Sequence, residues 1–477
     1  MADDPAPLGR SPAGRERRNG YLWLAGDHHV HTRHSPETAH RVADQIRHAN
    51  AYGLDWMAVT DRGRGPHTMD DVEQTNADIL VARRDVKDTL VFHGLEWNIP
   101  AAGHGTVLVH PGWNEVAVLR TFERFFDGVA RSATAPGPDN EALAVAGVRF
   151  LADAVTQRRI QDALLLVNHP ARRGVNSPHQ IRGWRDAGPR IAVGFEGAPG
   201  HQAAGIAAPA GQGSARGNYV HQPSAVSFPG YPAESYRTWG GFDWMTATVG
   251  GLWDSMLAEG RPWWITANSD SHRIHDDSAS HASGGFWPGF FSRTHVGATD
   301  FAYAAIMAGL RAGRSWVDHG GLIRGLDVRV RSGRRWATLG DTLIVRRGSP
   351  VELTITIDLA NGPNWAQFVP SLARVDVIRG AVTGPAADRD AFAAAQTSVA
   401  KTFDINRSTG VVAFGYPLGT LDEPFYVRLR GTDGNRGAPG CHGASVDPVG
   451  PAMDVVGGAD PWTDLWFYTN PIWVLPK

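Results

Sequence analysis

The chain has 477 residues, of which 42% are hydrophobic and 20% are charged, as is typical of a soluble globular protein that is long enough for more than one domain. Its 46 basic and 48 acidic residues nearly balance, so the charge gives no indication of an extended nucleic-acid track. The single cysteine, Cys441, excludes an internal disulfide, and a metal site must therefore be built from His, Asp and Glu.

The sequence lacks any run of about eighteen apolar residues, so no membrane-spanning helix is expected. Residues 1–20 are rich in Pro, Gly, Arg and Asp and predict a flexible tail, not a signal peptide. A signal removed beforehand would leave the same sequence, so the compartment stays open, the periplasm included. The subunit association also stays open, and a homo-oligomer is compatible with the sequence.

Short apolar runs alternate with helical patterns between residue 21 and about residue 320. Most of these runs are continuously apolar, as strands buried on both faces are. This order predicts an α/β domain with a parallel sheet or barrel, whose functional loops follow the carboxyl ends of the strands. The expected strands are 22–30, 56–60, 89–92, 106–109, 164–167, 191–195 and 263–267, and the expected helices are 38–52, 71–86, 115–130, 140–160, 243–259 and 300–312.

Two long insertions interrupt this pattern, at residues 197–240 and 271–292. The first is rich in Gly, Ala, Pro and Ser and predicts a long surface loop over the barrel mouth, and the second carries His and Asp before an aromatic stretch. Loops of this length are usually functional lids or disordered segments, and the sequence does not decide between these.

After about residue 321 the apolar runs alternate with polar positions and are separated by Gly, Pro, Asn and Asp. This pattern predicts a smaller antiparallel β-sandwich domain over residues 321–477. The stretch 465–474 predicts a final strand that packs this part of the chain against an apolar surface.

The first expected strand ends in two histidines, His29 and His31. Because side chains alternate along a strand, these two point to one face and His28 points to the other. Two imidazoles on one face can bind a single metal ion, each through one ring nitrogen. Histidines also cap strands and donate hydrogen bonds in cores, so the pair alone does not establish a metal site.

Potential ligands also lie at the ends of the other expected strands. A parallel barrel gathers these strand ends onto one face, where the side chains would converge. Any one of them alone is more often a turn or capping residue, but the whole set favours a metal centre. The residues are Asp61, His93, Glu96, His104, His110, His169, Glu196, Asp270 and His272.

These motifs resemble the polymerase and histidinol phosphatase (PHP) superfamily of metal-dependent hydrolases. The resemblance extends over about residues 22–275 and implies a distorted (β/α)7 barrel with a multinuclear metal site. The β-rich tail with its Asn-Pro-Ile strand is most similar to the carbaryl-hydrolase (CehA/McbA-like) branch. The matching segments are Asp27–Thr32, Val59–Asp61, Gly94–Glu96, Asn168–Pro170 and Ser269–His272.

The resemblance implies which residues bind the metal ions. One ion would be bound by His29, His31, Glu96 and Asp270. Glu96 would bridge to a second ion, which His169 and a histidine after Glu96 complete. We favour His104 over His110 for this role, because a Gly-His pair that enters a strand matches the branch. The His and carboxylate ligands suit Zn, Mn or Fe and do not distinguish among them.

The main departure from the family lies at Arg62, where relatives usually have histidine after Thr-Asp. That histidine is normally a ligand of a third ion, whose other ligands would come from His34 or Glu37, and His272 matches a position that serves the third ion in many relatives. Arginine cannot coordinate a cation. We therefore predict two divalent ions. The Arg62 guanidinium would occupy the place of the third ion and bind phosphate, or alternatively pair with a surface acid.

The implied activity is hydrolysis of a small-molecule phosphate ester, with a diester favoured because Arg62 supplies less charge than a third cation. Asp61 and His272 are candidates to move the proton or orient the water, and Arg62, Arg172 and Arg173 are candidates to bind phosphate oxygens. The alternative is hydrolysis of a carbamate, amide or ester at the same site. A further alternative is a binding protein without activity.

Overall fold

The computed structural model describes residues 17–36, 38–62, 71–203, 219, 222–236, 238–272, 286–365, 369–433 and 465–477. Glu37, Cys441 and most of the predicted N-terminal tail lie outside these residues. The tail prediction is wrong for its last residues, because β1 (Arg17–Arg18) pairs antiparallel with β2 (Tyr21–Val30). No helix in the described ranges is long and apolar enough to cross a membrane.

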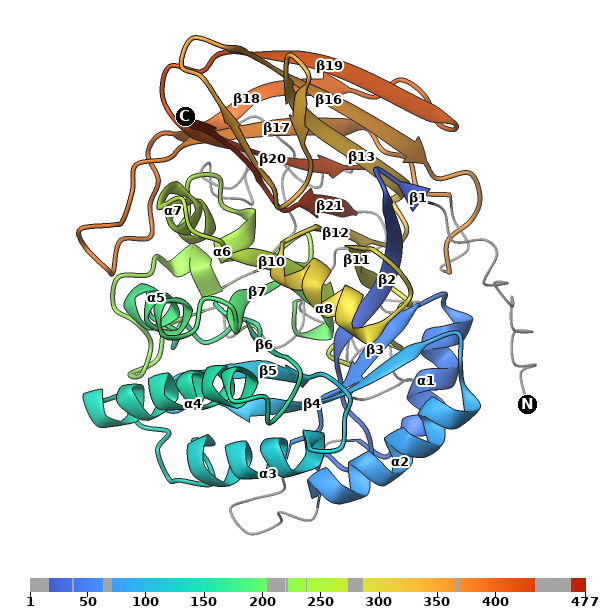
Figure 1. Cartoon of the computed structure of the whole chain (residues 1–477), viewed down its shortest axis with the longest axis vertical. Helices are drawn as coiled ribbons and strands as arrows, with labels where there is room; N and C mark the ends of the chain where they lie inside the picture. Colours follow the sequence, from blue (N-terminus) through green and yellow to red (C-terminus); the bar gives the residue numbers. More distant parts are fainter. Residues whose placement is uncertain are drawn as a thin grey trace.

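A large mixed sheet forms the centre of the molecule (Figure 1). Its first part has the order β10-β7-β6-β5-β4-β3-β2-β11-β12. The pairs β2–β3, β3–β4, β6–β7 and β7–β10 are parallel, whereas β5 runs antiparallel to both of its neighbours. The strands that follow β2 are β3 (Trp56–Val59), β4 (Leu90–Asn98), β5 (His104–Val109), β6 (Ala163–Val167), β7 (Ala192–Pro199), β10 (Trp264–Asn268), β11 (Ser292–Ala298) and β12 (Ser315–His319).

The sheet does not close into the expected (β/α)7 barrel in the part of the chain that the structure describes. Strands β2 and β10 meet only at one isolated parallel bridge, Val30–Ser271, next to a 3.0 Å hydrogen bond from the His31 N–H to the Ser271 carbonyl. Instead, β11 pairs antiparallel with β2, and its Thr294 bonds to the backbone of Ala267 in β10. Strands β2 and β10 therefore approach each other only at their carboxyl ends, where the candidate ligands lie.

Most of the helices pack against the sheet in two core clusters. Helices α1 and α2 pack with β2 and β3, and helices α3, α4, α5 and α8 share the larger core with strands β4 to β7. The structure also contains a helix that the sequence patterns did not suggest, α5. The helices are α1 (Val42–Ala51), α2 (Asp71–Asp85), α3 (Glu115–Phe126), α4 (Pro138–Thr156), α5 (Pro178–Ala187) and α8 (Tyr303–Arg311).

The predicted helix 243–259 is two short helices, α6 (Trp244–Ala247) and α7 (Leu252–Ala258). Gly250, with φ of +75°, separates them. The predicted loop 197–240 is only partly a loop, because it contributes the end of β7, two short 3-10 turns, η2 (Gly200–Gln202) and η3 (Ala233–Tyr236), and the first strand of the β8 (Thr238–Trp239) and β9 (Phe242–Asp243) hairpin. From this insertion Tyr219 is buried and donates a hydrogen bond to Asp243.

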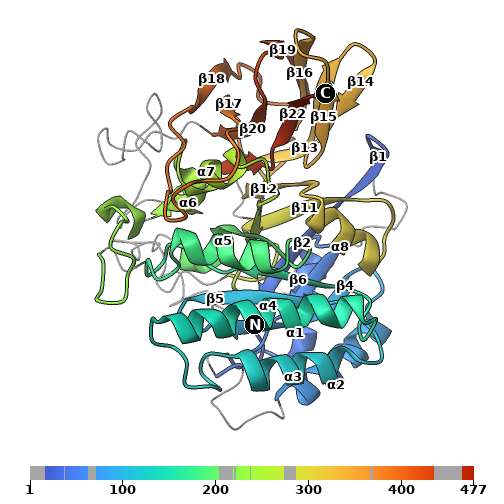
Figure 2. The ribbon, with the colours of Figure 1, turned by 60° about the vertical axis from the view of Figure 1, so that its left-hand side comes forward.

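The C-terminal part is rich in antiparallel strands, as expected (Figure 2). One sheet has the order β14-β13-β16-β19, and its apolar face packs against strands β17, β20, β21 and β22. These latter strands continue the large sheet through the β12–β21 pair, so the sandwich shares a sheet with the first part. The strands are β13 (Ile323–Ser332), β14 (Arg335–Ala337), β15 (Thr342–Val345), β16 (Pro350–Leu359), β17 (Arg374–Ala381), β18 (Thr397–Asp404), β19 (Val411–Thr420), β20 (Phe425–Thr432), β21 (Trp466–Thr469) and β22 (Ile472–Pro476).

The Asn-Pro-Ile segment between β21 and β22 supports strand β10. Asn470 Oδ1 accepts a 2.9 Å hydrogen bond from the Ile265 N–H, and Asn470 Nδ2 donates to the Ile265 carbonyl at 3.2 Å. One side-chain amide thus makes the two hydrogen bonds that a neighbouring strand would make. Because β10 leads directly to Asp270, the C-terminal segment helps to place the candidate ligands that follow it.

We predict that Asn470→Ala lowers the free energy of unfolding by about 1–3 kcal/mol, because the buried Ile265 N–H and carbonyl lose their partners. Urea unfolding of the two proteins measures this difference. The control is Asn140→Ala, since Asn140 only donates to the Ala135 carbonyl on the exposed surface. Equal effects of the two substitutions would contradict the role given to Asn470.

Candidate metal centre

His29 and His31 present the same nitrogen, Nε2, to one point. Both side chains are fully buried, and their Nε2 atoms are 3.0 Å apart. His29 Nδ1 donates to Glu196 Oε1 at 2.7 Å. The Ser35 hydroxyl donates its proton to Asp61, so it can only accept from His31. His31 Nδ1 therefore donates to Ser35 Oγ, at 2.9 Å. These partners hold a proton on each Nδ1, so that Nε2 is the nitrogen of each ring that can bind a cation.

Glu96 and Asp270 complete a cage around this point, which we call position A. Asp270 Oδ1 lies 3.2 Å from His29 Nε2 and 3.4 Å from His31 Nε2. The two oxygens of Glu96 lie 3.3 Å and 3.5 Å from the same two nitrogens. A tetrahedral ion with bonds of about 2.0–2.1 Å keeps its ligand atoms about 3.3 Å apart. The four side chains therefore fit a metal ion.

A second group of ligands, position B, shares Glu96 with position A. Glu96 Oε1 lies 2.8 Å from His104 Nδ1 and 3.6 Å from His169 Nε2. The three ligand atoms lie within 4.8 Å of one another, and His169 Nε2 is buried without a hydrogen-bond partner in the described part of the chain. The carboxylate of Glu96 thus stands between two candidate cation positions.

The direction of β5 explains why His104 and not His110 joins this group. Because β5 runs antiparallel to β4 and β6, its first residue lies at the carboxyl ends of its neighbours, with His104 opposite Asn98. His110 lies at the other end of β5, where its Nδ1 donates to the Pro111 carbonyl at 2.8 Å. His104, and not His110, therefore lies next to Glu96 and His169.

The electrostatics of the centre suit a cation. Burial raises the pKa of Glu96 and of Asp270, but nearby histidines outweigh this effect and hold both pKa values well below the usual range. His29 acts on both carboxylates, His104 acts on Glu96, and His272 acts on Asp270. Burial lowers the pKa of His31 to about 3 and also lowers that of His169, so both are neutral donors. The donors thus have the charges that a metal ion requires.

His29 carries the positive charge of the centre when no metal ion is bound. Burial lowers its pKa, but the carboxylates of Asp270, Glu196 and Glu96 outweigh burial and raise it well above the usual value. The imidazolium is then the cation among three buried acids. A metal ion that binds Nε2 must displace this proton.

Two candidate ligands have strained backbones. His169 has φ of +29° and Asp270 has φ of +46°, in the left-handed region that non-glycine residues rarely adopt. Hydrogen bonds from His169 N–H to Glu196 and from Ser269 N–H to Asp27 hold these segments in place, at 2.7 Å and 2.9 Å. Such strain clusters at functional sites. Asp27 also accepts a hydrogen bond from the His29 N–H and therefore holds backbone at the ends of both β2 and β10.

Asp61 lies behind His31 and does not face the ligand atoms. Its oxygens accept hydrogen bonds from the Thr32 N–H and the Ser35 hydroxyl, both at 2.6 Å. Asp61 therefore acts on the centre through Ser35 and His31. This arrangement differs from the expected catalytic role of Asp61 in moving a proton or orienting water.

Arg62 points toward the centre, not toward the surface. Its Nε lies 3.7 Å from Glu96 Oε2, and its side chain is 23% exposed, so the guanidinium is accessible beside a buried carboxylate. The Arg62 N–H also donates to Ser35 Oγ at 3.2 Å.

The two other arginines that we expected to bind phosphate, Arg172 and Arg173, differ in their exposure to solvent. Arg172 is half-buried, donates to Gln202 Oε1 at 2.8 Å, and is close enough to Asp270 and Glu96 for their charges to oppose the lowering of its pKa by burial. Arg173 is exposed, and its carbonyl accepts from Ser227. Only Arg172 of this pair is thus placed beside the centre.

His272 touches two of the ligands of position A. Its Nδ1 lies 2.9 Å from Asp270 Oδ1, and its ring centroid lies 4.0 Å from that of His31. Asp270 and His272 form a third group of possible ligands with His201, which the sequence analysis did not select. His201 lies five residues after Glu196, within the stretch that we interpreted as a surface loop. His201 could have been selected as a candidate ligand, because it follows closely after a strand that ends in the acid Glu196.

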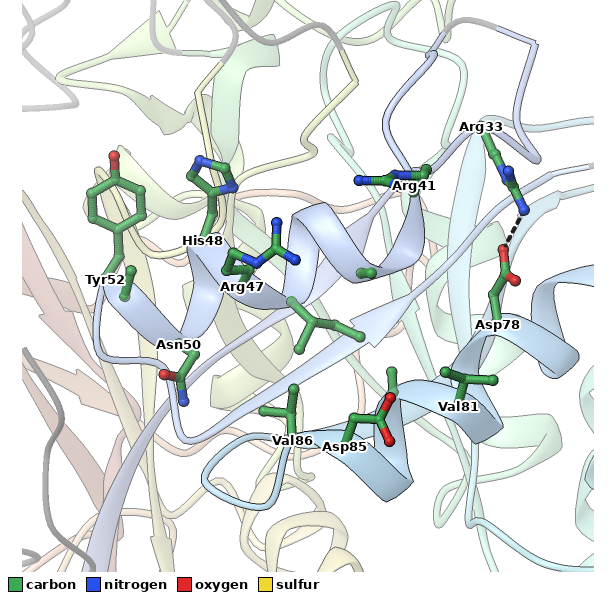
Figure 3. Close-up of a pocket in the computed structure, with 14 residues that line it drawn as sticks. Arg33, Arg41, Arg47, His48, Asn50, Tyr52, Asp78, Val81, Asp85 and Val86 are labelled. Carbon is green, nitrogen blue, oxygen red and sulfur yellow. Dashed lines mark hydrogen bonds and ion pairs between the residues drawn. The ribbon is translucent and has the colours of Figure 1, made fainter. Parts of the chain in front are cut away.

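A groove of about 470 Å³ between α1 and α2 is separate from the metal centre (Figure 3). Its floor is apolar, and the guanidinium of Arg33 at its edge pairs with Asp78 at 2.9 Å. Arg41, also at the edge, pairs with Asp44 at 2.8 Å. None of the candidate metal ligands lines this groove.

We predict that the purified protein binds two divalent ions tightly and that Glu96→Gln reduces this number to at most one, because both positions share that carboxylate. His104→Asn is expected to remove only the ion at position B. Elemental analysis after gel filtration measures the content of each protein. The matched control is His110→Asn, which should keep both ions; three tightly bound ions, or equal losses in the two histidine variants, would contradict the assignment.

The affinity for the ions should rise with pH. The raised pKa of His29 means that its Nε2 carries a proton at neutral pH, and this proton must leave when an ion binds. Below that pKa we expect about a tenfold gain in affinity per pH unit for one displaced proton. Competition with a chelator between pH 6 and pH 8 measures this slope, and an affinity independent of pH would show that His29 Nε2 is not a ligand.

No protein-family model matches the sequence, and neither does any curated protein. Solved structures do show similarity. A two-domain protein from Bacteroides vulgatus ATCC 8482, described as containing a predicted PHP-like metal-dependent phosphoesterase, is 14% identical, with 86% of this chain and 91% of that chain covered and a TM-score of 0.35.

Two further structures have lower TM-scores. Endonuclease Q in complex with a 27-mer duplex substrate is 11% identical, with 61% and 57% of the two chains covered and a TM-score of 0.32. A putative metal-dependent phosphoesterase from Bifidobacterium adolescentis ATCC 15703 is 15% identical, with 36% and 76% covered and a TM-score of 0.21. None of the three is described as a carbaryl hydrolase. Similar structures thus include PHP-like metal-dependent phosphoesterases, the superfamily that the sequence motifs resemble.

Proposed function

We propose that the protein is a metal-dependent phosphoesterase of the PHP type whose substrate is a small phosphate ester. The observation that carries this proposal is the shared carboxylate of Glu96, which lies between two groups of ligands and next to the Arg62 guanidinium. Paired cations beside a fixed positive side chain form an arrangement that stabilises the charge of a phosphoryl group.

The residues of positions A and B would hold two divalent cations. Such a pair supplies two things when bound, a lowered pKa for a coordinated water and polarisation of a phosphoryl oxygen. No thiolate belongs to the ligand groups in the described residues, and the His and carboxylate donors suit Zn, Mn or Fe.

The positively charged side chains next to the centre would bind the phosphate. Arg62 offers a planar guanidinium next to Glu96, and such a group can bind two phosphate oxygens at once. Arg172, held by Gln202, supplies positive charge near Asp270 and Glu96. A diester, with one negative charge, needs less compensation than a monoester, so we favour a diester for a centre with two ions and these arginines.

Asp61 and His272 support the centre through their contacts. The Asp61–Ser35–His31 series of hydrogen bonds keeps Nε2 of His31 directed at position A. His272 lies against Asp270 and His31 and would act through them. We therefore assign both residues positioning roles in place of the proton transfer that we expected.

The test compares bis(p-nitrophenyl) phosphate with 1-naphthyl methylcarbamate, because the same centre could attack a carbamate carbonyl. We predict turnover of the phosphate diester and its loss in metal-free protein. Arg62→Ala should lower kcat/KM for the diester by roughly tenfold to a hundredfold, the loss of a charged hydrogen bond. Arg62→Lys should recover part of this loss.

The control for the arginine is Arg120→Ala, because Arg120 forms an exposed ion pair with Glu73 and should not affect turnover. Turnover of the carbamate alone would favour the alternative hydrolase. Absence of hydrolysis of both compounds, with both ions bound, would favour a binding protein and overturn the proposal.

A further inference from the structure

We propose that His201, Asp270 and His272 form a third cation position, position C, on the other side of Asp270 from position A. Each residue offers a ligand atom, and these atoms lie within 4.8 Å of one another. The donor set, two imidazoles and a shared carboxylate, is the same as that of position B. Three cation positions would then follow one another in the order B, A, C, with Glu96 shared by B and A and Asp270 shared by A and C.

A rigid turn holds His201 in place. Gly200 has φ of +54°, and a Cβ atom at this residue would lie 2.0 Å from the Ser269 carbonyl oxygen, so only glycine allows this close approach. The His201 N–H donates to the same carbonyl at 3.0 Å. The turn therefore packs directly against Ser269, the residue before Asp270.

The carboxylate of Asp270 is surrounded by imidazole nitrogens. Both of its oxygens are buried, and no backbone N–H, hydroxyl or amide group in the described part of the chain donates to them. Oδ1 faces the imidazole nitrogens of His29 and His272, at 3.2 Å and 2.9 Å. A buried carboxylate without such donors needs positive charge around it, and the row of cation positions supplies it.

His201 and His272 belong to the same small space. Their ring centroids are 5.0 Å apart with planes inclined by 73°, and both side chains are nearly buried. His201 Nδ1 lies 3.4 Å from the Ser269 carbonyl oxygen, and its Nε2 lies 3.3 Å from the side-chain nitrogen of Gln202. A histidine buried beside a carboxylate and a second histidine is well suited to bind a cation.

Position C shares His272 with the place where the family resemblance put a third ion and differs in its other ligands. The family place would also use His34 or Glu37 and the residue at position 62, but His34 Nε2 bonds to Asp78 at 3.0 Å and Arg62 contacts Glu96. The inferred ion instead depends on His201, which no family motif marks.

The third ion should bind more weakly than the other two. It would share its only carboxylate with position A and would be repelled by the two cations already present. Its effect on the reaction rests on the proposed function: added positive charge next to position A would favour a doubly charged monoester over a singly charged diester.

Titration with Mn²⁺, followed through the electron paramagnetic resonance signal of the free ion, tests this inference. The full-length protein that retains two ions after gel filtration should bind one more, saturably. His201→Asn and His201→Gln should keep the two tight ions and weaken the third by at least about tenfold. Retention of the two ions shows that the variants are folded.

The matched control is His48→Asn, because His48 lies on α1, where its ring stacks on Trp287 and its Nδ1 donates to the Asp44 carbonyl. It should bind the third ion like the wild type. Added Mn²⁺ should also raise the ratio of monoesterase to diesterase activity in the wild type and not in the His201 variants.

Wild-type protein that stops at two ions, or His201 variants that bind the third with unchanged affinity, would overturn position C and leave the phosphoesterase proposal intact. Protein that binds two or three ions but hydrolyses no phosphate ester would overturn the proposed function while the binding data still decide on position C.

Discussion

The site depends on one constraint, the burial of the Glu96 carboxylate where several strands end. A buried carboxylate is stable only when positive charge or hydrogen-bond donors compensate it. Around Glu96 these are mainly imidazole nitrogens, with the Asn168 amide at 3.3 Å and the Arg62 guanidinium at 3.7 Å. His31 and His169 are neutral and contribute donor atoms without charge, so a metal ion that displaces the proton of His29 would supply the positive charge in its place.

The surrounding structure serves to hold these donor atoms in place. Glu196 bonds both to the His29 ring and to the His169 backbone, and thereby couples a ligand of position A to one of position B. Asp27 joins the ends of β2 and β10 by accepting from the N–H groups of His29 and Ser269. Because the Nδ1 atoms of His29 and His31 are held by hydrogen bonds to Glu196 and Ser35, these two rings are preorganised for an ion.

Much of the centre could be predicted from the sequence, because its ligands lie at strand ends and apolar runs mark the strands. His29, His31 and Asp270 were found in this way. The direction of β5 and the open edge between β2 and β10 are results of tertiary pairing, which no local pattern encodes. His201 was missed because it lies on a turn whose position is fixed by the contact of Gly200 with Ser269, far along the chain. Helix α5 was missed although Ser177 and Gln180 form a capping box at its start.

The most direct test of the shared carboxylate is anomalous diffraction at the manganese absorption edge from crystals of the Mn²⁺-loaded protein. We predict one peak beside His29 and His31 and a second beside His104 and His169, with the Glu96 carboxylate between them. A single peak, or two peaks that do not share Glu96, would contradict the account.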